Sequence, residues 1–296
     1  MAEQLDYAIP RWLPPLLGLR DESVEHLVAV RPAPRDPADP SERVPMSLPR
    51  HFALGDRQPA TRLAESIESA IASRSQLSVE QYSATILCGS CAPFIHDLDE
   101  RAVRLVEPMV SGEARSFDAA EQRLLAAWGA RTAYAVLGVE RKSQGVPRSH
   151  RRALREDEEP HENVFVGLGR YRGSDIAVLA GRLAVRLGDP ETTGEVGAYA
   201  VAAVFGHLVL KVFGIRRRPA GTAVRPPQGE LVQFWPTSFE RTTWPPIWSV
   251  SGQTLEHVFK QVPFYRPFDY SDIRYQGPGK KIPARRKRTE GLRGRH

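Results

Sequence analysis

Two cysteines are the residues of this chain whose type and spacing most directly suggest chemistry. Cys88 and Cys91 are its only cysteines, and they enclose a Gly-Ser pair. Two thiolates at this spacing make half of a tetrahedral zinc site, which normally takes four Cys or His ligands. His26, His96 and Asp97 could complete the set, but their spacing matches no closed zinc pattern. We therefore weigh a structural zinc on Cys88 and Cys91 against a pair of shielded thiols.

A redox role for the cysteine pair is a third interpretation. A thioredoxin-like pair needs a preceding strand, a helix that starts at the cysteines and a βαβ context. A strand over 83–87 is expected, but Pro93 and Phe94 separate the pair from the following helix, and no βαβ pattern surrounds it. The sequence therefore favours a metal-ligand pair or plain thiols over redox catalysis.

Two amphipathic helices are predicted after the cysteines. Apolar residues fall near helical spacing between Leu98 and Met109, which predicts the first helix. The second is predicted from Ser116, its expected cap, to Gly138, with Trp128 on its apolar face. Together they predict a helical hairpin.

The segments around this hairpin are predicted to be short helices and loops. A short apolar helix is expected near Pro10, and a second over 61–74. The Pro-rich text over 31–50 predicts a loop, and the Arg- and Glu-rich text over 141–160 predicts another. The arginines of the second loop could add a basic patch for nucleic acid, although a solvated face is the simpler interpretation.

The sequence after Asn163 predicts β structure. Strands are expected over the ranges 164–166, 176–187, 199–213 and 231–235. The third range could also be a buried helix, but its β-branched and aromatic residues favour a strand. Gly167 and Gly169 suggest a turn or bulge rather than a phosphate loop, and His207 suggests a core histidine. The fold class predicted for the whole chain is α+β, with a largely antiparallel β-rich C-terminal half.

Aromatic residues are dense between Gln233 and Asp272. Interleaved with Arg241, Lys260 and Arg266, they could form a surface on which bases stack and phosphates bind. Trp and Phe flanked by Pro more often pack on the edge of a sheet, and we favour that interpretation here.

Positive charge is concentrated at the C-terminus. Residues 279–296 hold eight Lys or Arg residues and one Glu, a net charge of +7, so the other 278 residues sum to −1. Pro and Gly punctuate this segment, which predicts a disordered tail able to contact phosphates. The candidate nucleic-acid-binding residues are Lys280, Lys281, Arg285, Arg286, Lys287, Arg288, Arg293 and Arg295. A solubilising tail that binds nothing specific is the alternative.

The rest of the composition is that of a globular protein. The chain has 296 residues, of which 41% are hydrophobic and 26% charged. It contains no run of about 18 apolar residues, the length that spans a membrane. The first twelve residues carry two acids and no apolar signal core. We therefore expect a cytoplasmic protein with no membrane partner.

Three stretches of the sequence resemble a bacterial and phage group of HNH-endonuclease-like proteins. Residues 6–13 read Asp-Tyr-Ala-Ile-Pro-Arg-Trp-Leu, and residues 88–95 read Cys-Gly-Ser-Cys-Ala-Pro-Phe-Ile, with Leu98-Asp99 after them. The family pattern has Glu-His-x-x-Pro-x-Trp-Leu, then Cys-x-x-Cys-Asn-x-x-Trp with a Leu-Glu pair, then a helical hairpin with a Trp in its second helix. Trp128 falls at the place of that Trp, and the resemblance covers roughly residues 6–140.

The resemblance implies a metal-dependent nuclease site, and this sequence departs from it where the chemistry is done. In such a site a His general base activates water while one divalent cation, Mg²⁺ or Mn²⁺, binds the scissile phosphate. Tyr7 stands at the position of the base, and a tyrosine with a pKa near 10 stays protonated at neutral pH. Asp6 replaces the family's Glu and could still bind a hard cation, but Ala92 replaces the Asn and has no polar side-chain atom.

The first Cys-x-x-Cys of the family pattern would precede Asp6, where this sequence has five residues. Either the sequence begins late or the zinc site has been lost. Loss agrees better with Tyr7 and Ala92, because a late start would remove ligands without replacing the base.

The sequence as a whole predicts a nucleic-acid-associated protein with impaired catalysis. We expect a degenerate HNH-like region with its helical hairpin over 1–140, a β-rich domain over 160–275 and a disordered basic tail over 276–296. A first alternative is an active metal-dependent nuclease that uses Asp6 with an unaligned histidine such as His26, His51 or His96. A second alternative is a structural or interaction protein of a phage or defence system.

Overall fold

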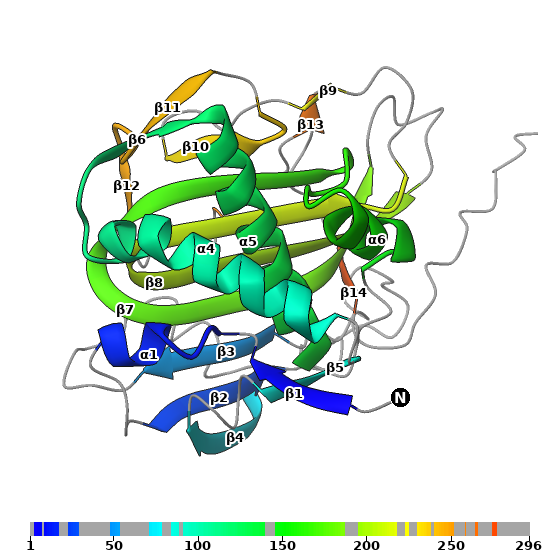
Figure 1. Ribbon diagram of the computed structural model, residues 1–296. Coiled ribbons are helices and arrows are strands. Elements are labelled where there is room, and N and C mark those ends of the chain that lie inside the picture. Colours follow the sequence, from blue (N-terminus) through cyan, green and yellow to red (C-terminus); the bar gives the residue numbers. More distant parts are fainter. Residues whose placement is uncertain are drawn as a thin grey trace, which may run out of the picture.

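The chain folds into helices packed on one face of a mostly antiparallel sheet, which confirms the predicted α+β class (Figure 1). A computed structural model describes residues 3–7, 9–17, 23–29, 48–53, 71–78, 84–88, 91–139, 146–186, 195–217, 223–224, 230–237, 240–251, 258, 264–265 and 274–276. No helix in this part of the chain is long and apolar enough to cross a membrane. The eight cationic residues of the tail, from Lys280 to Arg295, lie outside these ranges.

A long hairpin of two strands forms the centre of the sheet. Strand β7 (Val164–Arg186) pairs antiparallel with β8 (Glu195–Ile215) along nearly its whole length. The turn or bulge expected around Gly167, Gly169 and Gly173 falls at the last of these, because Gly167 and Gly169 lie inside β7 and the register shift falls between Arg170 and Asp175. A Cβ at Gly169 would lie 2.7 Å from Glu230 O, so this glycine lets the neighbouring strand approach closely.

The hairpin folds back on itself, as its U shape in Figure 1 shows. The bend coincides with the register shift in β7 and with Gly206, which has a φ of +59°. A Cβ at Gly206 would lie 2.7 Å from Val110 O. The two ends of β8 therefore come together, and Arg216 N donates a hydrogen bond to Gly197 O at 3.0 Å.

Strands from the N-terminal half extend this sheet. They are β2 (Ser23–Ala29), β3 (Leu48–Ala53) and β4 (Ile71–Ser78), in the sheet order β10-β7-β3-β2-β4. Two predictions are corrected at the ends of their ranges, because β3 begins inside the expected loop over 31–50 and β4 inside the expected helix over 61–74. The rest of these two ranges lies outside the described residues. Pairing of β2 with both strands decides the conformation of β3 and β4 over a weak local periodicity.

Short strands from the C-terminal half complete the sheets. Strand β10 (Leu231–Trp235) lies where the sequence predicts it and pairs with β7. The others are β9 (Ala223–Val224), β11 (Arg241–Trp244), β12 (Ser249–Val250), β13 (Phe264–Tyr265) and β14 (Arg274–Gln276). Trp244 is fully buried and donates to Gly169 O, as the expected packing on the sheet requires, whereas Trp248 is 61% exposed.

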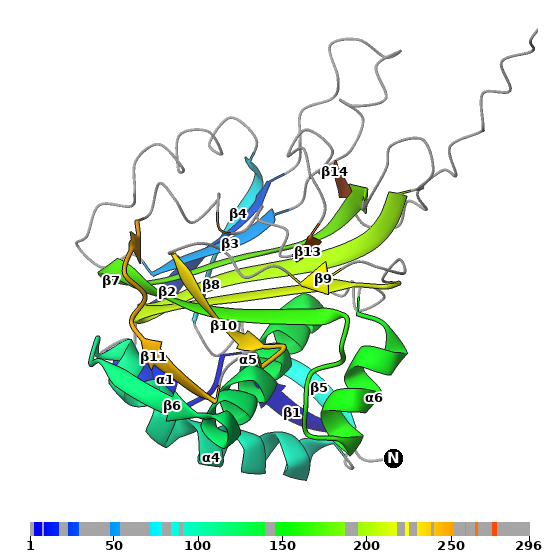
Figure 2. The ribbon, with the colours of Figure 1, turned by 90° about the horizontal axis from the view of Figure 1, so that it is seen from above.

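The helices cover one face of the sheet, as the view from above shows (Figure 2). They are α1 (Leu13–Leu16), α4 (Ala92–Val110), α5 (Ala119–Val139) and α6 (Arg148–Glu156). The expected hairpin of α4 and α5 is present, but Ser116 does not cap the second helix. Residues 115–118 instead form strand β6 (Arg115–Asp118), which pairs with β11.

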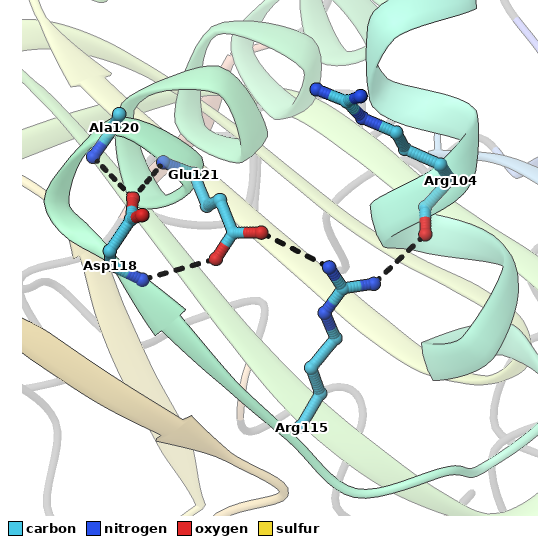
Figure 3. Close-up of polar contacts among 5 residues, drawn as sticks. All are labelled: Arg104, Arg115, Asp118, Ala120 and Glu121. Atoms are coloured by element: carbon cyan, nitrogen blue, oxygen red, sulfur yellow. Dashed lines mark hydrogen bonds and ion pairs between the residues drawn. The ribbon is translucent and has the colours of Figure 1, made fainter.

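Helix α5 begins with a reciprocal cap (Figure 3). Asp118 Oδ1 accepts the N–H groups of Ala120 and Glu121 at 2.9 Å, and Glu121 Oε2 accepts the N–H of Asp118 at 3.2 Å. Arg115 donates to Glu121 and to Arg104 O, both at 3.0 Å. This capping box fixes the start of α5, and the arginine ties that start to α4.

Candidate functional site

The two segments that carry the HNH resemblance meet in one small sheet. Strand β1 (Glu3–Tyr7) pairs antiparallel with β5 (Ala84–Cys88), which confirms the strand expected before Cys88. Asp6 lies opposite Thr85 and Tyr7 opposite Ala84, whereas Cys88 lies opposite Glu3. Three residues along a strand span roughly 10 Å. The strand pairing therefore places Asp6 and Tyr7 at the end of this sheet that is away from Cys88.

Cys91 stands at the turn between β5 and α4. It is the N-cap residue of α4, and its side chain is half-buried. Of the side chains considered as further zinc ligands, His96 is exposed and pairs with Glu100 at 3.2 Å, and Asp97 pairs with Arg101 at 3.0 Å. A group of three or more His, Cys, Asp or Glu side chains suited to a metal does not occur in the described ranges. Zinc on Cys88 and Cys91 stays a prediction.

The other residues of the resemblance have structural contacts. Trp12 lies against Trp128 with ring centroids 6.5 Å apart, so the first segment packs on the second helix of the hairpin. Asp99, at the acidic position of the Leu-Glu pair, binds Arg131 at 3.0 Å; the arginine is buried and the aspartate mostly so. Asp99 therefore ties α4 to α5.

A cluster of two histidines and two tyrosines lies between α5, α6 and β8. His150 Nδ1 and Tyr199 Oη are 2.9 Å apart, and Tyr199 Oη donates to Tyr134 Oη at 3.4 Å. The imidazoles of His150 and His161 stack at 4.6 Å. His161 Nδ1 accepts the N–H of Asn163 at 3.1 Å, so a neutral His161 carries its proton on Nε2.

Burial keeps His150, Tyr134 and Tyr199 neutral. It lowers the pKa of His150 to about 3, with a smaller contribution from the charge of His161. It also raises the pKa of both Tyr134 and Tyr199 above the ordinary value. His150 is fully buried and its hydrogen-bonding partner Tyr199 is too. The network is therefore suited to holding α6 on the body rather than to moving protons to a substrate. No sequence motif indicated it, since His150 fell in an expected loop.

Lys211 is a second chemically notable residue that the sequence analysis did not single out as a site. It is 1% exposed, and burial lowers its pKa well below the usual value. It lies opposite Gly167, and its Nζ is 5.9 Å from the centre of the Phe213 ring. An amine of lowered pKa is a potential nucleophile, but this one is sealed from solvent. His207, expected in the core, is half-buried and contacts Tyr171 O at 3.2 Å.

Four arginines form the exposed face of α6, where the sequence predicted a loop. Arg148, Arg151, Arg152 and Arg155 are all exposed, while His150 and Leu154 point into the body and are buried. The helix was missed because only two of its side chains are buried, and one of them is a histidine.

Comparisons with known proteins leave the chain without an assigned family. It matches no protein-family model, no curated protein and no solved structure. What the described residues define is an α+β protein with a scaffold of paired strands β1 and β5, a tyrosine-histidine cluster and an arginine-covered helix.

Proposed function

We propose that this protein is nucleic-acid-associated, that it is built on an HNH-like scaffold without cleaving, and that it binds phosphates through its cationic segments. The observation that carries the proposal is the pairing of β1 with β5, which leads directly into α4. This pairing makes neighbours of the two segments with family-like residues, as a shared scaffold requires. The contact of Trp12 with Trp128 supports the same relationship.

The absence of cleavage is argued from the side chains at the positions of the reacting groups. A protonated tyrosine at position 7 is a poor base, and Ala92 offers a metal no ligand. Asp6 is the one residue of the pattern that could hold a divalent cation, and a single carboxylate binds Mg²⁺ weakly without substrate phosphates. Binding is then the function left to the cationic segments.

An active metal-dependent nuclease is the second candidate, because of one feature of the sheet. His26 on β2 lies directly opposite His51 on β3. Directly opposed residues are neighbours across an antiparallel pair, and histidine is a common ligand of divalent metals. In this case the histidines, rather than Tyr7, would supply the base or the ligands.

Plasmid nicking separates the two candidates. The full chain is incubated with supercoiled plasmid and Mg²⁺ or Mn²⁺, beside Asp6→Ala and the double variant His26→Ala/His51→Ala. We expect the wild-type chain to retard the plasmid on a gel while leaving it uncut. Cleavage that is lost in Asp6→Ala or in the double histidine variant would contradict the proposal and support the second candidate.

A further inference from the structure

The arginines of α6 lie in a single row on its exposed side. Residues 148, 151, 152 and 155 fall within about 100° of arc on a helical wheel with 3.6 residues per turn. The buried side chains His150 and Leu154 project to the opposite side. Seven residues of helix span about 10.5 Å. Over that length a nucleic-acid duplex carries roughly six phosphate charges.

Two of the acids that follow α6 are drawn away from this row. Glu158 binds Arg101 on α4 at 2.9 Å, and Glu159 binds Arg123 on α5 at 3.6 Å. Glu158 has a positive φ of 54°, a conformation that turns the chain towards α4. These two acids therefore pair with arginines on the neighbouring helices, whereas Glu156 and Asp157 stay at the C-terminal end of the row, beside Arg152.

Within the row itself, one arginine is paired. Arg152 binds Glu156 at 2.6 Å. Arg148, Arg151 and Arg155 form no ion pair with any residue that the structure describes. Three positive charges therefore face solvent along one side of α6.

Two further arginines lie at the same end of the molecule. Arg216 and Arg217 follow the last residue of β8 and are exposed. Arg216 N bonds Gly197 O, two residues from Tyr199, whose hydroxyl bonds His150 of α6. Figure 1 shows α6 beside this end of the sheet. The His150–Tyr199 bond therefore holds α6 next to the end of β8.

Among the described residues, this surface carries positive charge but no large exposed aromatic ring on which a base could stack. The large apolar side chains exposed in the described ranges are Ile247 and Trp248. They belong to the connection between β11 and β12, which lies on the opposite side of the molecule from α6 in both views. Recognition of single strands relies on bases stacked on aromatic rings, whereas duplexes present phosphates on a rigid, regularly spaced backbone.

We propose that the α6 arginines, with the end of β8, form a folded docking surface for the phosphate backbone of a nucleic-acid duplex, independent of base sequence. This rests on the proposed function and adds to the basic tail a second interface in a defined place. Arg148, Arg151 and Arg155 each contact a phosphate, and Arg217 extends the track.

The test compares two triple variants of the full chain. Arg148→Gln/Arg151→Gln/Arg155→Gln removes the three arginines from the row. Arg104→Gln/Arg172→Gln/Arg241→Gln removes the same charge from three exposed arginines elsewhere. Binding of a fluorescent duplex and of a single strand of equal length is measured over a range of salt concentrations. Thermal unfolding confirms that each variant is folded.

For duplex binding, we expect the α6 variant to reduce the slope of log K against log salt by about 2.7, since each phosphate contact contributes about 0.9. The control variant should change it by much less. Equal losses in the two variants, an unchanged slope, or a loss confined to the single strand would overturn the α6 surface while leaving the proposed function standing. A wild-type chain that binds no duplex would overturn both.

Discussion

Several titratable side chains in the described part of the chain are buried and held in their neutral forms. His150, Tyr134 and Tyr199 form a buried hydrogen-bonded chain, and burial moves the pKa of each towards the neutral form. On β8, burial likewise lowers the pKa of Lys211 and favours its neutral form. Residues with shifted pKa values often mark catalytic sites, but here the shift comes with exclusion from solvent. The shifts are therefore consequences of packing, and they predict how stability depends on pH.

Acid should destabilise the fold through His150. Its pKa is about 3 in the folded chain and 6.5 as a model value. Between these pH values the unfolded chain binds a proton that the folded chain does not, so the free energy of unfolding falls as pH falls. The stabilisation is complete above pH 6.5, and from pH 7 to pH 5 about 2 kcal/mol should be lost. Urea unfolding at a series of pH values measures this loss.

A matched pair of variants isolates the histidine. His150→Phe keeps a ring beside His161 but cannot titrate, so its overall stability is lower while its pH dependence between 5 and 7 should be shallower than that of the wild type. His96→Gln removes an exposed histidine and should keep the wild-type dependence. Equal slopes for wild type and His150→Phe would count against the buried neutral state of His150.

Among the secondary-structure elements, the prediction was most accurate where the periodic pattern of apolar residues is long. The 3.6-residue periodicity that includes Leu98 and Trp128 gave α4 and α5, because each helix buries an apolar face over several turns. Helix α6 was missed because its single turn of contact buries only His150 and Leu154. The extent of β7 was missed because glycines usually end strands, whereas Gly169 here admits the backbone of a neighbouring strand.

The candidate site was less predictable than the fold, for a physical reason. The pairing of β1 with β5 joins residues some eighty positions apart, and its register alone decides that Asp6 lies opposite Thr85 instead of beside Cys88. Likewise, His150 meets Tyr199 only because α6 docks on the folded-back hairpin. Such long-range contacts leave no local periodicity in the sequence.

The joint between α4 and α5 should depend on one buried ion pair. Arg131 is 1% exposed and Asp99 13% exposed, and their closest atoms are 3.0 Å apart. Asp99→Asn would leave the guanidinium buried without its counter-charge, a change that costs about 3 kcal/mol. As a control, Glu156→Gln breaks the exposed pair with Arg152 and should leave stability nearly unchanged. Chemical denaturation of both variants gives the comparison, and equal effects would argue against a structural role for Asp99.

The whole molecule divides its charge between a nearly neutral body and a cationic tail. Residues 279–296 carry a net charge of +7 and the rest of the chain −1. On the body, the arginines of α6 still present local positive charge, because nearby acids pair with Arg101 and Arg123. A polyanion could therefore meet both a folded surface and the tail, and each should contribute its own part of the salt dependence.

Deletion of residues 279–296 tests this division. If all eight cations of the tail contact phosphates, the slope of log K against log salt should become less steep by up to about 7, at about 0.9 per contact. The segment is predicted from its composition to be disordered, so its removal should leave the unfolding midpoint unchanged. Weaker binding should persist through α6 with a slope of about −3, and combining the deletion with the α6 substitutions should abolish it. An affinity that neither the deletion nor salt alters would rule out phosphate binding by the tail, and a deletion variant with no residual binding would leave the tail as the whole interface.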